Sequence, residues 1–122
     1  MDISLTDREA DVMRVLWDRG PSIVAEVRDE LADTLAYTTV LTMLRTLEAK
    51  GYVAHEEEGR VHRYYPTVGE KAARKSALSH LKNKLFKGSS ELLFAHLVSE
   101  QRLTPQQIKK MRKLLREQSR KE

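Results

Sequence analysis

Residues 37–51 have the sequence Tyr-Thr-Thr-Val-Leu-Thr-Met-Leu-Arg-Thr-Leu-Glu-Ala-Lys-Gly, and this stretch decides the fold. Its apolar residues recur every three to four positions, the period of a helix that packs one face on a core. These residues are Val40, Leu41, Met43, Leu44 and Leu47. Gly51 stands where a residue of left-handed conformation would end the helix. The pattern therefore predicts a helix over about residues 38–50.

The opposite face of this helix is rich in threonine. It carries Thr38, Thr39, Thr42, Arg45 and Thr46. Threonine is a mediocre helix former, so four of them on one exposed face cost helix stability. Short hydroxyl and methyl groups beside one arginine are, however, what a helix needs to enter a DNA major groove closely. The stretch alone leaves two interpretations open: a DNA recognition helix and a threonine-rich surface helix.

Two helices are predicted before this stretch. Residues 5–9, Leu-Thr-Asp-Arg-Glu, form a capping box in which Thr6 and Glu9 each bond the other's amide. The first helix then ends near Gly20, and Ser22 is predicted to be the N-cap of a second, short helix. The buried stripe of the first helix is Ala10, Met13, Leu16 and Trp17. That of the second is Ile23, Val27 and Leu31.

After Gly51 the apolar period changes from helical to alternating, which predicts strands. Residues 52–56 and 61–65 are the two strands, and Glu57-Glu58-Gly59-Arg60 is the turn of the hairpin between them. Three helices followed by a hairpin is the order of a winged helix-turn-helix, with the third helix as the DNA-reading element and the hairpin as the wing. This order favours the recognition-helix interpretation.

From Gly69 onward the sequence is helical again, with three amphipathic helices opened or closed by Gly88, Ser89 or Ser90, and Thr104. Their apolar residues are predicted to lie in a dimer interface: Leu78, Leu81, Leu85, Leu92, Leu93, Leu97, Ile108, Met111, Leu114 and Leu115. A sheetless segment of this length can scarcely cover such faces by itself, so we expect a homodimer of C2 symmetry. The alternative is that these helices fold back on the winged helix.

The predicted fold is therefore mainly α with a small β-hairpin wing. We expect a winged helix-turn-helix DNA-binding domain at residues 1–67 and a helical dimerisation region at residues 68–122. Residues 1–66 hold 8 Lys and Arg against 13 Asp and Glu, whereas residues 67–122 hold 14 against 5. The predicted recognition helix thus lies in the acidic half of a chain whose net charge is +4. Charge alone would place nucleic acid on the other half.

Several classes of function are not expected. No run approaches the ~20 apolar residues of a membrane span, so we predict a cytoplasmic protein without membrane insertion. No cysteine is present, which excludes disulfides and cysteine zinc sites. The histidines, His55, His62, His80 and His96, never stand three or four positions apart, so no metal or other cofactor is expected. His55 and His62 lie close together if the hairpin pairs as predicted, and a solvated strand face accounts for them equally well. No residue set typical of nucleophilic catalysis is evident, and an enzyme is not expected.

The sequence resembles the penicillinase-repressor family (BlaI/MecI/CopY type) over essentially its full length. The residues that carry the resemblance are Leu5-Thr6 with Glu9, Val15-Leu16-Trp17, Glu26-Val27, Ala36 to Val40, Leu47 to Val53, Gly59-Arg60 and Tyr64-Tyr65-Pro66. The family implies a bacterial transcriptional repressor that binds a palindromic operator in double-stranded DNA as a homodimer. Its third helix would lie in the major groove.

By position in that family, Thr38 and Thr39 would contact bases. Contacts to the backbone or groove would come from Tyr37, Thr42, Arg45, Arg60, His62 and Arg63. Lys71 and Arg74 are further candidates for backbone contact from the fourth helix. Several relatives have lysine in place of Thr38 and arginine in place of Leu41, so this chain carries less charge on the helix.

The wing contains an acidic run, Glu56-Glu57-Glu58, which would repel phosphates. One interpretation is that these carboxylates face away from DNA while Arg60 and Arg63 face it. A second is that the winged helix binds protein instead, and a third is a small-molecule-responsive regulator with a pocket between dimer helices.

The resemblance also bears on induction. Antibiotic-responsive members are cleaved by a protease at an Asn-Phe bond, but the single asparagine here, Asn83, precedes Lys84. Proteolytic induction is therefore not supported, and the inducer stays unidentified. The cysteine motif of the copper-responsive members is absent as well.

Overall fold

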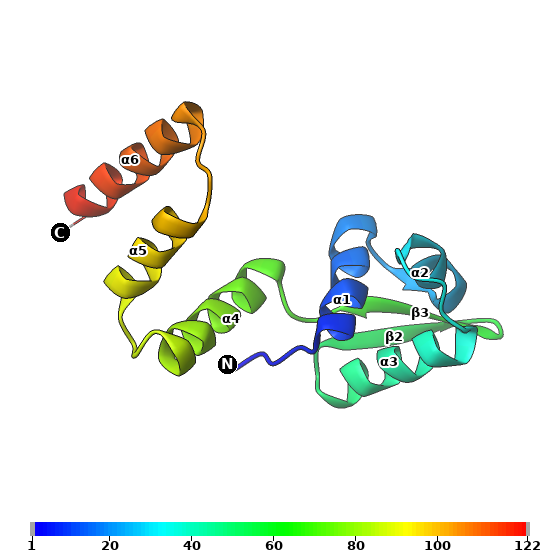
Figure 1. Ribbon diagram of the computed structural model, residues 1–122. Coiled ribbons are helices and arrows are strands. Elements are labelled where there is room, and N and C mark those ends of the chain that lie inside the picture. Colours follow the sequence, from blue (N-terminus) through cyan, green and yellow to red (C-terminus); the bar gives the residue numbers. More distant parts are fainter. Residues whose placement is uncertain (1, 122) are drawn as a thin grey trace. The chain divides into compact units, whose positions relative to one another are not determined.

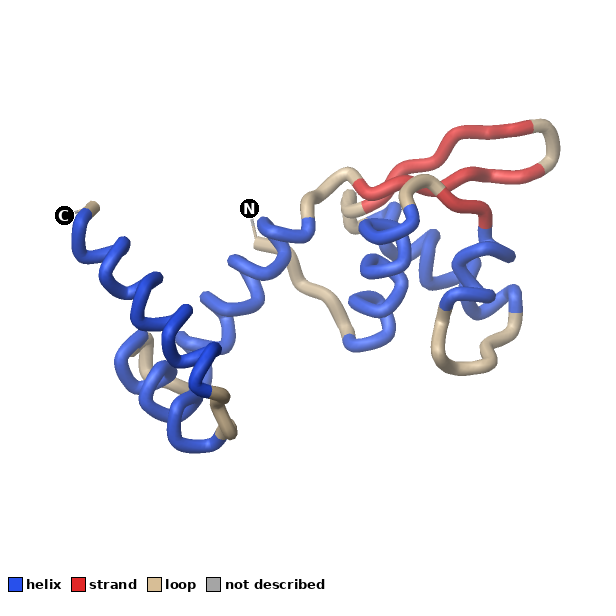
Figure 2. The backbone as a smooth tube through the Cα atoms, turned by 90° about the horizontal axis from the view of Figure 1, so that it is seen from above, coloured by secondary structure: helices blue, strands red, loops and turns tan. Residues whose placement is uncertain are grey.

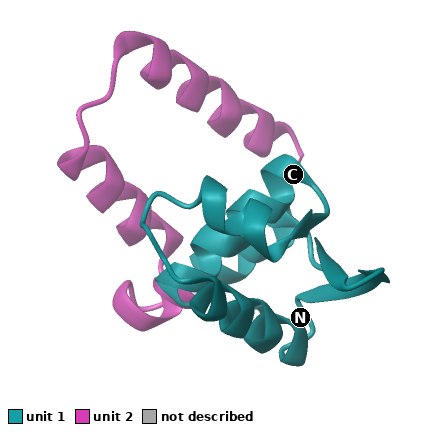
Figure 3. Cartoon of the chain, turned by 90° about the vertical axis from the view of Figure 1, so that its right-hand side faces the viewer, with its two compact units in different colours: residues 1–78 teal, residues 79–122 magenta. Residues whose placement is uncertain are grey.

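The computed structural model describes residues 2–121, which form six helices and a three-stranded sheet (Figure 1). The mainly helical fold with a small β component is confirmed. The chain divides into two compact units, Met1–Leu78 and Ser79–Glu122, which are coloured separately in Figure 3. The first unit contains α1, β1, α2, α3, β2, β3 and the start of α4, and the second contains the rest of α4 with α5 and α6.

Helix α1 (Asp7–Arg19) begins with the predicted capping box. The Glu9 amide donates to Thr6 Oγ1 at 3.2 Å, and the Thr6 amide donates to Glu9 Oε1 at 2.9 Å. Its buried stripe is wider than predicted, because Val12 and Val15 are buried beside Met13 and Leu16, while Ala10 is only half-buried. Trp17 is also half-buried against the core, and its indole N–H donates to the Val68 carbonyl at 2.9 Å.

The prediction that Ser22 caps the second helix is wrong. Ser22–Ile23 is a short strand, β1, that pairs antiparallel with β3 through Ser22↔Tyr64 and Ile23↔Arg63. The Ser22 hydroxyl donates to the Gly20 carbonyl at 2.8 Å, and the N-cap position of the next helix is occupied by Ile23. Helix α2 (Val24–Glu30) instead starts after Ile23, whose amide donates to the Glu26 carboxylate at 3.0 Å.

Helix α3 (Tyr37–Ala49) matches the predicted helix, with Val40, Leu44 and Leu47 fully buried. Its end is a Schellman motif, in which the Tyr52 amide donates to the Leu47 carbonyl at 3.0 Å and the Gly51 amide donates to the Glu48 carbonyl at 2.9 Å. Gly51 has φ +84°, the left-handed conformation predicted for it.

The hairpin consists of β2 (Val53–Glu58) and β3 (Val61–Pro66), joined by the two residues Gly59 and Arg60. The predicted four-residue turn is therefore wrong, because Glu57 and Glu58 continue the ladder and pair with His62 and Val61. Gly59 makes the tight turn at φ +61°. The sheet order is β1-β3-β2, and in Figure 2 the strands run along one side of the helices of this unit.

The hydrophobic core of Met1–Leu78 is drawn from all three helices and the sheet. Met13, Val27, Leu44 and Tyr64 are each at most 1% exposed. Helix α4 (Glu70–Leu85) contributes Ala73 to this core through its first turns. This unit therefore closes a core of its own.

The second unit, Ser79–Glu122, has no buried residue between positions 79 and 121. It contains α5 (Ser90–Glu100) and α6 (Pro105–Arg120), capped as predicted by Ser89 and by the capping box of Thr104 and Gln107. Over residues 2–121, no helix combines the length and apolar content that crossing a membrane requires.

Candidate nucleic-acid interface

The threonine face of α3 is exposed along its length, as predicted. Its exposed residues are Tyr37, Thr38, Thr39, Thr42, Arg45 and Thr46. The apolar face on the other side is fully buried at Val40, Leu44 and Leu47, so the rotation of the helix about its axis is set by the core. A helix surface of short hydroxyl side chains with a single cation, Arg45, can approach a base edge closely.

The threonine hydroxyls fall into two groups. Thr42 Oγ1 donates to the Thr38 carbonyl and Thr46 Oγ1 donates to the Thr42 carbonyl, each at 2.9 Å. These two hydroxyls already donate their protons to carbonyls of the helix, so they can only accept further hydrogen bonds. Over residues 2–121, neither the Thr38 nor the Thr39 hydroxyl makes a hydrogen bond. The two residues predicted to contact bases therefore keep both donor and acceptor capacity.

An ion pair anchors the end of α3 to the start of α1. Lys50 Nζ lies 2.7 and 2.9 Å from the two carboxylate oxygens of Glu9, a residue that is only 5% exposed. Burial alone would raise the pKa of Glu9, but the hydrogen bonds from Lys50 and the Thr6 amide outweigh it and lower the pKa below its ordinary value. The ammonium group of Lys50 is thus engaged in the ion pair with Glu9. Arg45 is the exposed cation within α3.

Strand alternation separates the three glutamates of the wing. Glu57 points to the same face of the hairpin as His55, His62 and Tyr64, whereas Glu56 and Glu58 lie on the other face with Arg63. The interpretation that all three carboxylates turn away from the side of Arg63 is therefore wrong. The register of the hairpin, which sequence alone did not determine, sets the face on which each glutamate lies.

Arg63 is held by carboxylates from two elements. Its Nε donates to Glu58 at 2.6 Å, and its Nη1 donates to Glu26 of α2 at 3.2 Å. The hydrogen bond that Arg63 donates to the Glu58 carboxylate is the main cause that raises the pKa of Arg63. The guanidinium thus ties the wing to α2. Arg60, at the tip, is exposed and forms no ion pair within residues 2–121.

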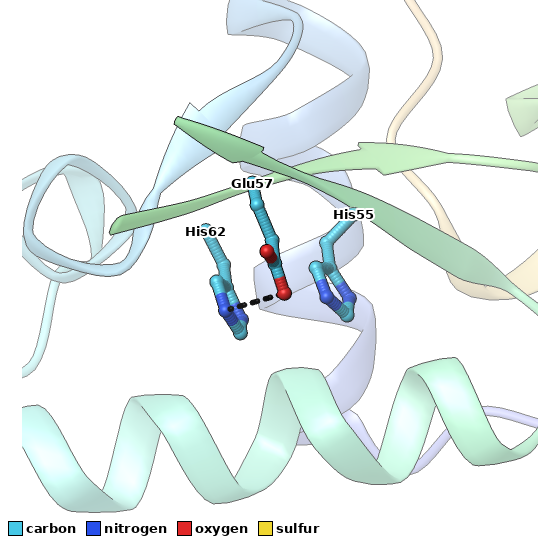
Figure 4. Close-up of side chains that lie close together, drawn as sticks. All are labelled: His55, Glu57 and His62. Atoms are coloured by element: carbon cyan, nitrogen blue, oxygen red, sulfur yellow. Dashed lines mark ion pairs between the residues drawn. The ribbon is translucent and has the colours of Figure 1, made fainter. Parts of the chain in front are cut away.

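The other face of the hairpin carries a cluster in which the proximity of His55 and His62 was predicted and the participation of Glu57 was not. His55, Glu57 and His62 lie together, and in Figure 4 their side chains point from the hairpin toward a helix. That helix is α3, since His55 Nδ1 lies 2.7–2.8 Å from both carboxylate oxygens of Glu48. Spacing along the chain misses this cluster because pairing across the hairpin creates it. Alternation along the two strands was the available signal.

Lys71 and Arg74 are exposed on the first turns of α4. Arg74 Nη2 lies 3.3 Å from Glu70, one helical turn before it. Such an exposed pair at i, i+4 is weak and leaves the guanidinium available to other anions.

In the second unit, the residues predicted for dimerisation lie at the surface. Leu85 is 73% exposed and Leu114 is 64% exposed. The others of this set are exposed or half-buried: Leu81, Leu92, Leu93, Leu97, Ile108, Met111 and Leu115. Leu78, the last residue of the first unit, is 55% exposed. Between α5 and α6, Phe94, Val98 and Met111 line an open apolar groove.

Comparison with known proteins gives a consistent result. The family model described as penicillinase repressor matches residues 5–117. A penicillinase repressor of Bacillus licheniformis is 28% identical over 115 residues, covering 93% of this chain and 90% of that protein. The solution structure of monomeric BlaI of Bacillus licheniformis with the blaP half-operator has 36% identity and TM-score 0.50, covering 58% of this chain and 89% of that one. A MarR family protein from Bacillus stearothermophilus, at 16% identity and TM-score 0.57, covers 98% of this chain and 76% of that one and shares the fold.

Proposed function

This chain belongs to the penicillinase repressor family, and from that premise we propose that it binds a palindromic operator as a homodimer and represses transcription in the bacterial cytoplasm. The family comprises DNA-binding transcriptional repressors, not enzymes. The observation that carries the proposal is the exposed face of α3, with Arg45 as its one cation, on a helix whose other face is buried in the core. The 36% identity to a BlaI domain solved with a half-operator supports it.

Helix α3 contacts the major groove with its first two turns. Thr38 and Thr39 contact base edges, because their hydroxyls are free to donate and accept and their methyl groups suit the thymine methyl. Tyr37, Thr42 and Arg45 lie beside them and contact the flanking backbone or groove.

Most of the phosphate attraction comes from outside α3, since Lys50 is held by Glu9. Arg60 at the wing tip and Lys71 with Arg74 on α4 supply it. His62 and Arg63 lie in strand β3 of the wing and are the other candidates there for contact with the DNA backbone or groove. Arg63 is already bonded to Glu58 and Glu26, so its contribution to binding is to fix the position of the hairpin.

The second unit joins two copies of the chain. Its helices leave apolar side chains such as Leu97 and Leu115 about half exposed, and a second copy with the same faces would bury them. A dimer presents two α3 helices to half-sites one DNA turn apart, about 34–36 Å. Occupied operators then exclude the polymerase.

The test is the salt dependence of DNA binding by the full-length chain. Affinity for a recovered operator should fall linearly on a log–log plot, by a factor of about 10³ or more between ~50 and ~200 mM salt. Fluorescence anisotropy with labelled operator measures this slope. The absence of any complex at ~50 mM salt would contradict the proposal and favour a protein-binding winged helix.

Reversing Lys71 and Arg74 to glutamate tests their assignment. If both contact phosphates, the variant should bind operator and random DNA equally more weakly, and the magnitude of the salt slope should drop by about two. The matched control reverses Lys113 and Arg116, which are exposed on α6. Unchanged affinity in the Lys71 and Arg74 variant would remove helix α4 from the interface.

A further inference from the structure

Three side chains with metal-ligand chemistry converge on the face of the wing that is turned toward α3. His55 and Glu57 come from β2 and His62 from β3, and a ligand atom of each lies within 4.8 Å of those of the other two. The convergence follows from the register, because Glu57 pairs directly with His62, and His55 lies two residues along the same face.

We propose that His55, Glu57 and His62 form a binding site for one divalent transition-metal cation of the zinc class. Two imidazoles and one carboxylate form a donor set that zinc accepts with a water molecule at the fourth position. His62 Nε2 lies 3.8 Å from Glu57 Oε1. Two ligands of one tetrahedral cation stand about 3.3 Å apart, given bonds of about 2.0–2.2 Å. A small side-chain rotation therefore closes the difference.

Glu48 of α3 completes the arrangement as an outer partner. Its carboxylate lies 2.7–2.8 Å from His55 Nδ1, so it accepts the proton of that nitrogen and leaves Nε2 for the cation. A carboxylate behind a ligating histidine orients the ring and strengthens it as a ligand. Because Glu48 belongs to α3, a cation at this site links the wing to the recognition helix.

The two imidazole rings already form a packed pair. Their centroids are 4.3 Å apart with planes 11° from parallel, and the buried Tyr64 ring lies 5.3 Å from His55. Parallel rings must tilt for their nitrogens to converge, which the soft terminal torsion of histidine allows. His62 and Glu57 are exposed enough for a cation to enter from solvent, at 40% and 75% of their side-chain surface.

A bound cation would also act on DNA affinity, a consequence that rests on the proposed function. It adds two positive charges beside Glu57 and fixes the wing against α3, so operator affinity should rise when the site is filled.

The first experiment uses the full-length chain without DNA. Titration with Co²⁺ should give the d–d absorption of a tetrahedral nitrogen and oxygen site at one cation per chain, and Zn²⁺ should displace it. His62→Gln and Glu57→Gln should abolish the signal, and Glu48→Gln should lower affinity by about tenfold or more. His80→Gln, at an exposed histidine of the second unit, should leave the signal unchanged. Far-ultraviolet circular dichroism checks that each variant is folded.

An absent cobalt signal, or equal loss in His62→Gln and His80→Gln, would overturn the site. The second experiment measures operator affinity with and without Zn²⁺ in the wild type and in His62→Gln. Tightening in the wild type alone supports regulation by the cation. Cobalt binding without any zinc effect on DNA would overturn the regulation, whereas no DNA binding in metal-free buffer would count against the proposed function itself.

Discussion

The two units are both largely helical but differ in where their apolar side chains lie. Within residues 2–121, every buried apolar residue belongs to Met1–Leu78, where three helices and a sheet enclose it. Helices α5 and α6 have none, although Leu97 and Leu115 are as apolar as the core leucines. Amphipathic helices close a core only when a sheet or a partner covers them. Met1–Leu78 thus closes a core of its own, whereas Ser79–Glu122 leaves its apolar faces exposed, as expected if a second copy of the chain covers them as proposed.

The largest expected effect tests this difference in stability. Leu44→Ala in the closed core should lower the free energy of unfolding by about 3 kcal/mol, because it leaves a cavity. Leu114→Ala removes the same atoms from an exposed position. Its effect should depend on protein concentration if this residue lies in the proposed dimer interface. Thermal melts of both variants at several concentrations measure this, and a concentration-independent loss at Leu114 would show that α6 packs within its own chain.

The second effect concerns the partner copy. Replacing Leu97 and Leu115 together by aspartate should separate the dimer, because charges cannot be buried unpaired. Operator affinity should then fall by about 100-fold or more, as two linked half-site contacts become independent. Sedimentation velocity and operator titration measure the two changes. Lys113→Asp on α6, the helix of Leu115, is the control, and a double variant that remains dimeric would exclude these faces from the interface.

The third effect concerns the ion pair that anchors α3. Lys50→Met should cost about 1–3 kcal/mol of stability, because it leaves the carboxylate of Glu9 buried without its partner. Arg74→Met, which breaks an exposed pair with Glu70, should cost at most about 0.5 kcal/mol. Urea unfolding compares the two. Equal costs would show that the Glu9 pair contributes no more than a surface pair.

The same pair predicts a dependence on pH. The pKa of Glu9 is lower in the folded chain than its ordinary value of 4.5. Its contribution is therefore fully present above that value and is lost as the pH falls through the lowered pKa. Stability of Glu9→Gln should decline less steeply with acid than that of the wild type. Urea unfolding across this acid range measures the slopes, and identical slopes would contradict the assignment.

The smallest effect concerns base recognition. Thr39→Ala should reduce the discrimination between operator and random DNA by about 1 kcal/mol, roughly fivefold, with little change in binding to random DNA. Thr46→Ala is the control, because that hydroxyl already donates inside the helix. Competition binding measures the ratio. An equal loss on both DNAs would mean that Thr39 only positions the helix.

Local signals in the sequence were enough to predict α1 and α3. The capping box at Thr6 and the left-handed Gly51 are decided by neighbours a few residues away. Strand β1 was missed because Ser22 is a favourable helix cap in isolation. Its partner in the sheet, Tyr64, lies far along the chain, so local propensity could not reveal the pairing.

In the candidate interface, too, features set by local periodicity were predicted from the sequence, and features set by distant residues were not. The exposure of Thr38 and Thr39 followed from the period of the helix. The ion pairs of Arg63 did not, because Glu26 lies 37 residues away in the chain. The proximity of His55 and His62 followed from the predicted hairpin, but Glu57 was missed as their neighbour because it was assigned to the turn, whereas it pairs with His62 within the ladder.

The most direct test of the central claim is selection of bound fragments from random DNA by the full-length chain. If two α3 helices contact DNA in one dimer, the recovered sites should be palindromes whose half-sites lie about one helical turn apart, ~10 base pairs. The Leu97 and Leu115 double variant should lose this enrichment while keeping weak binding to half-sites. Recovery of unpaired or unrelated sequences by the wild type would contradict the account.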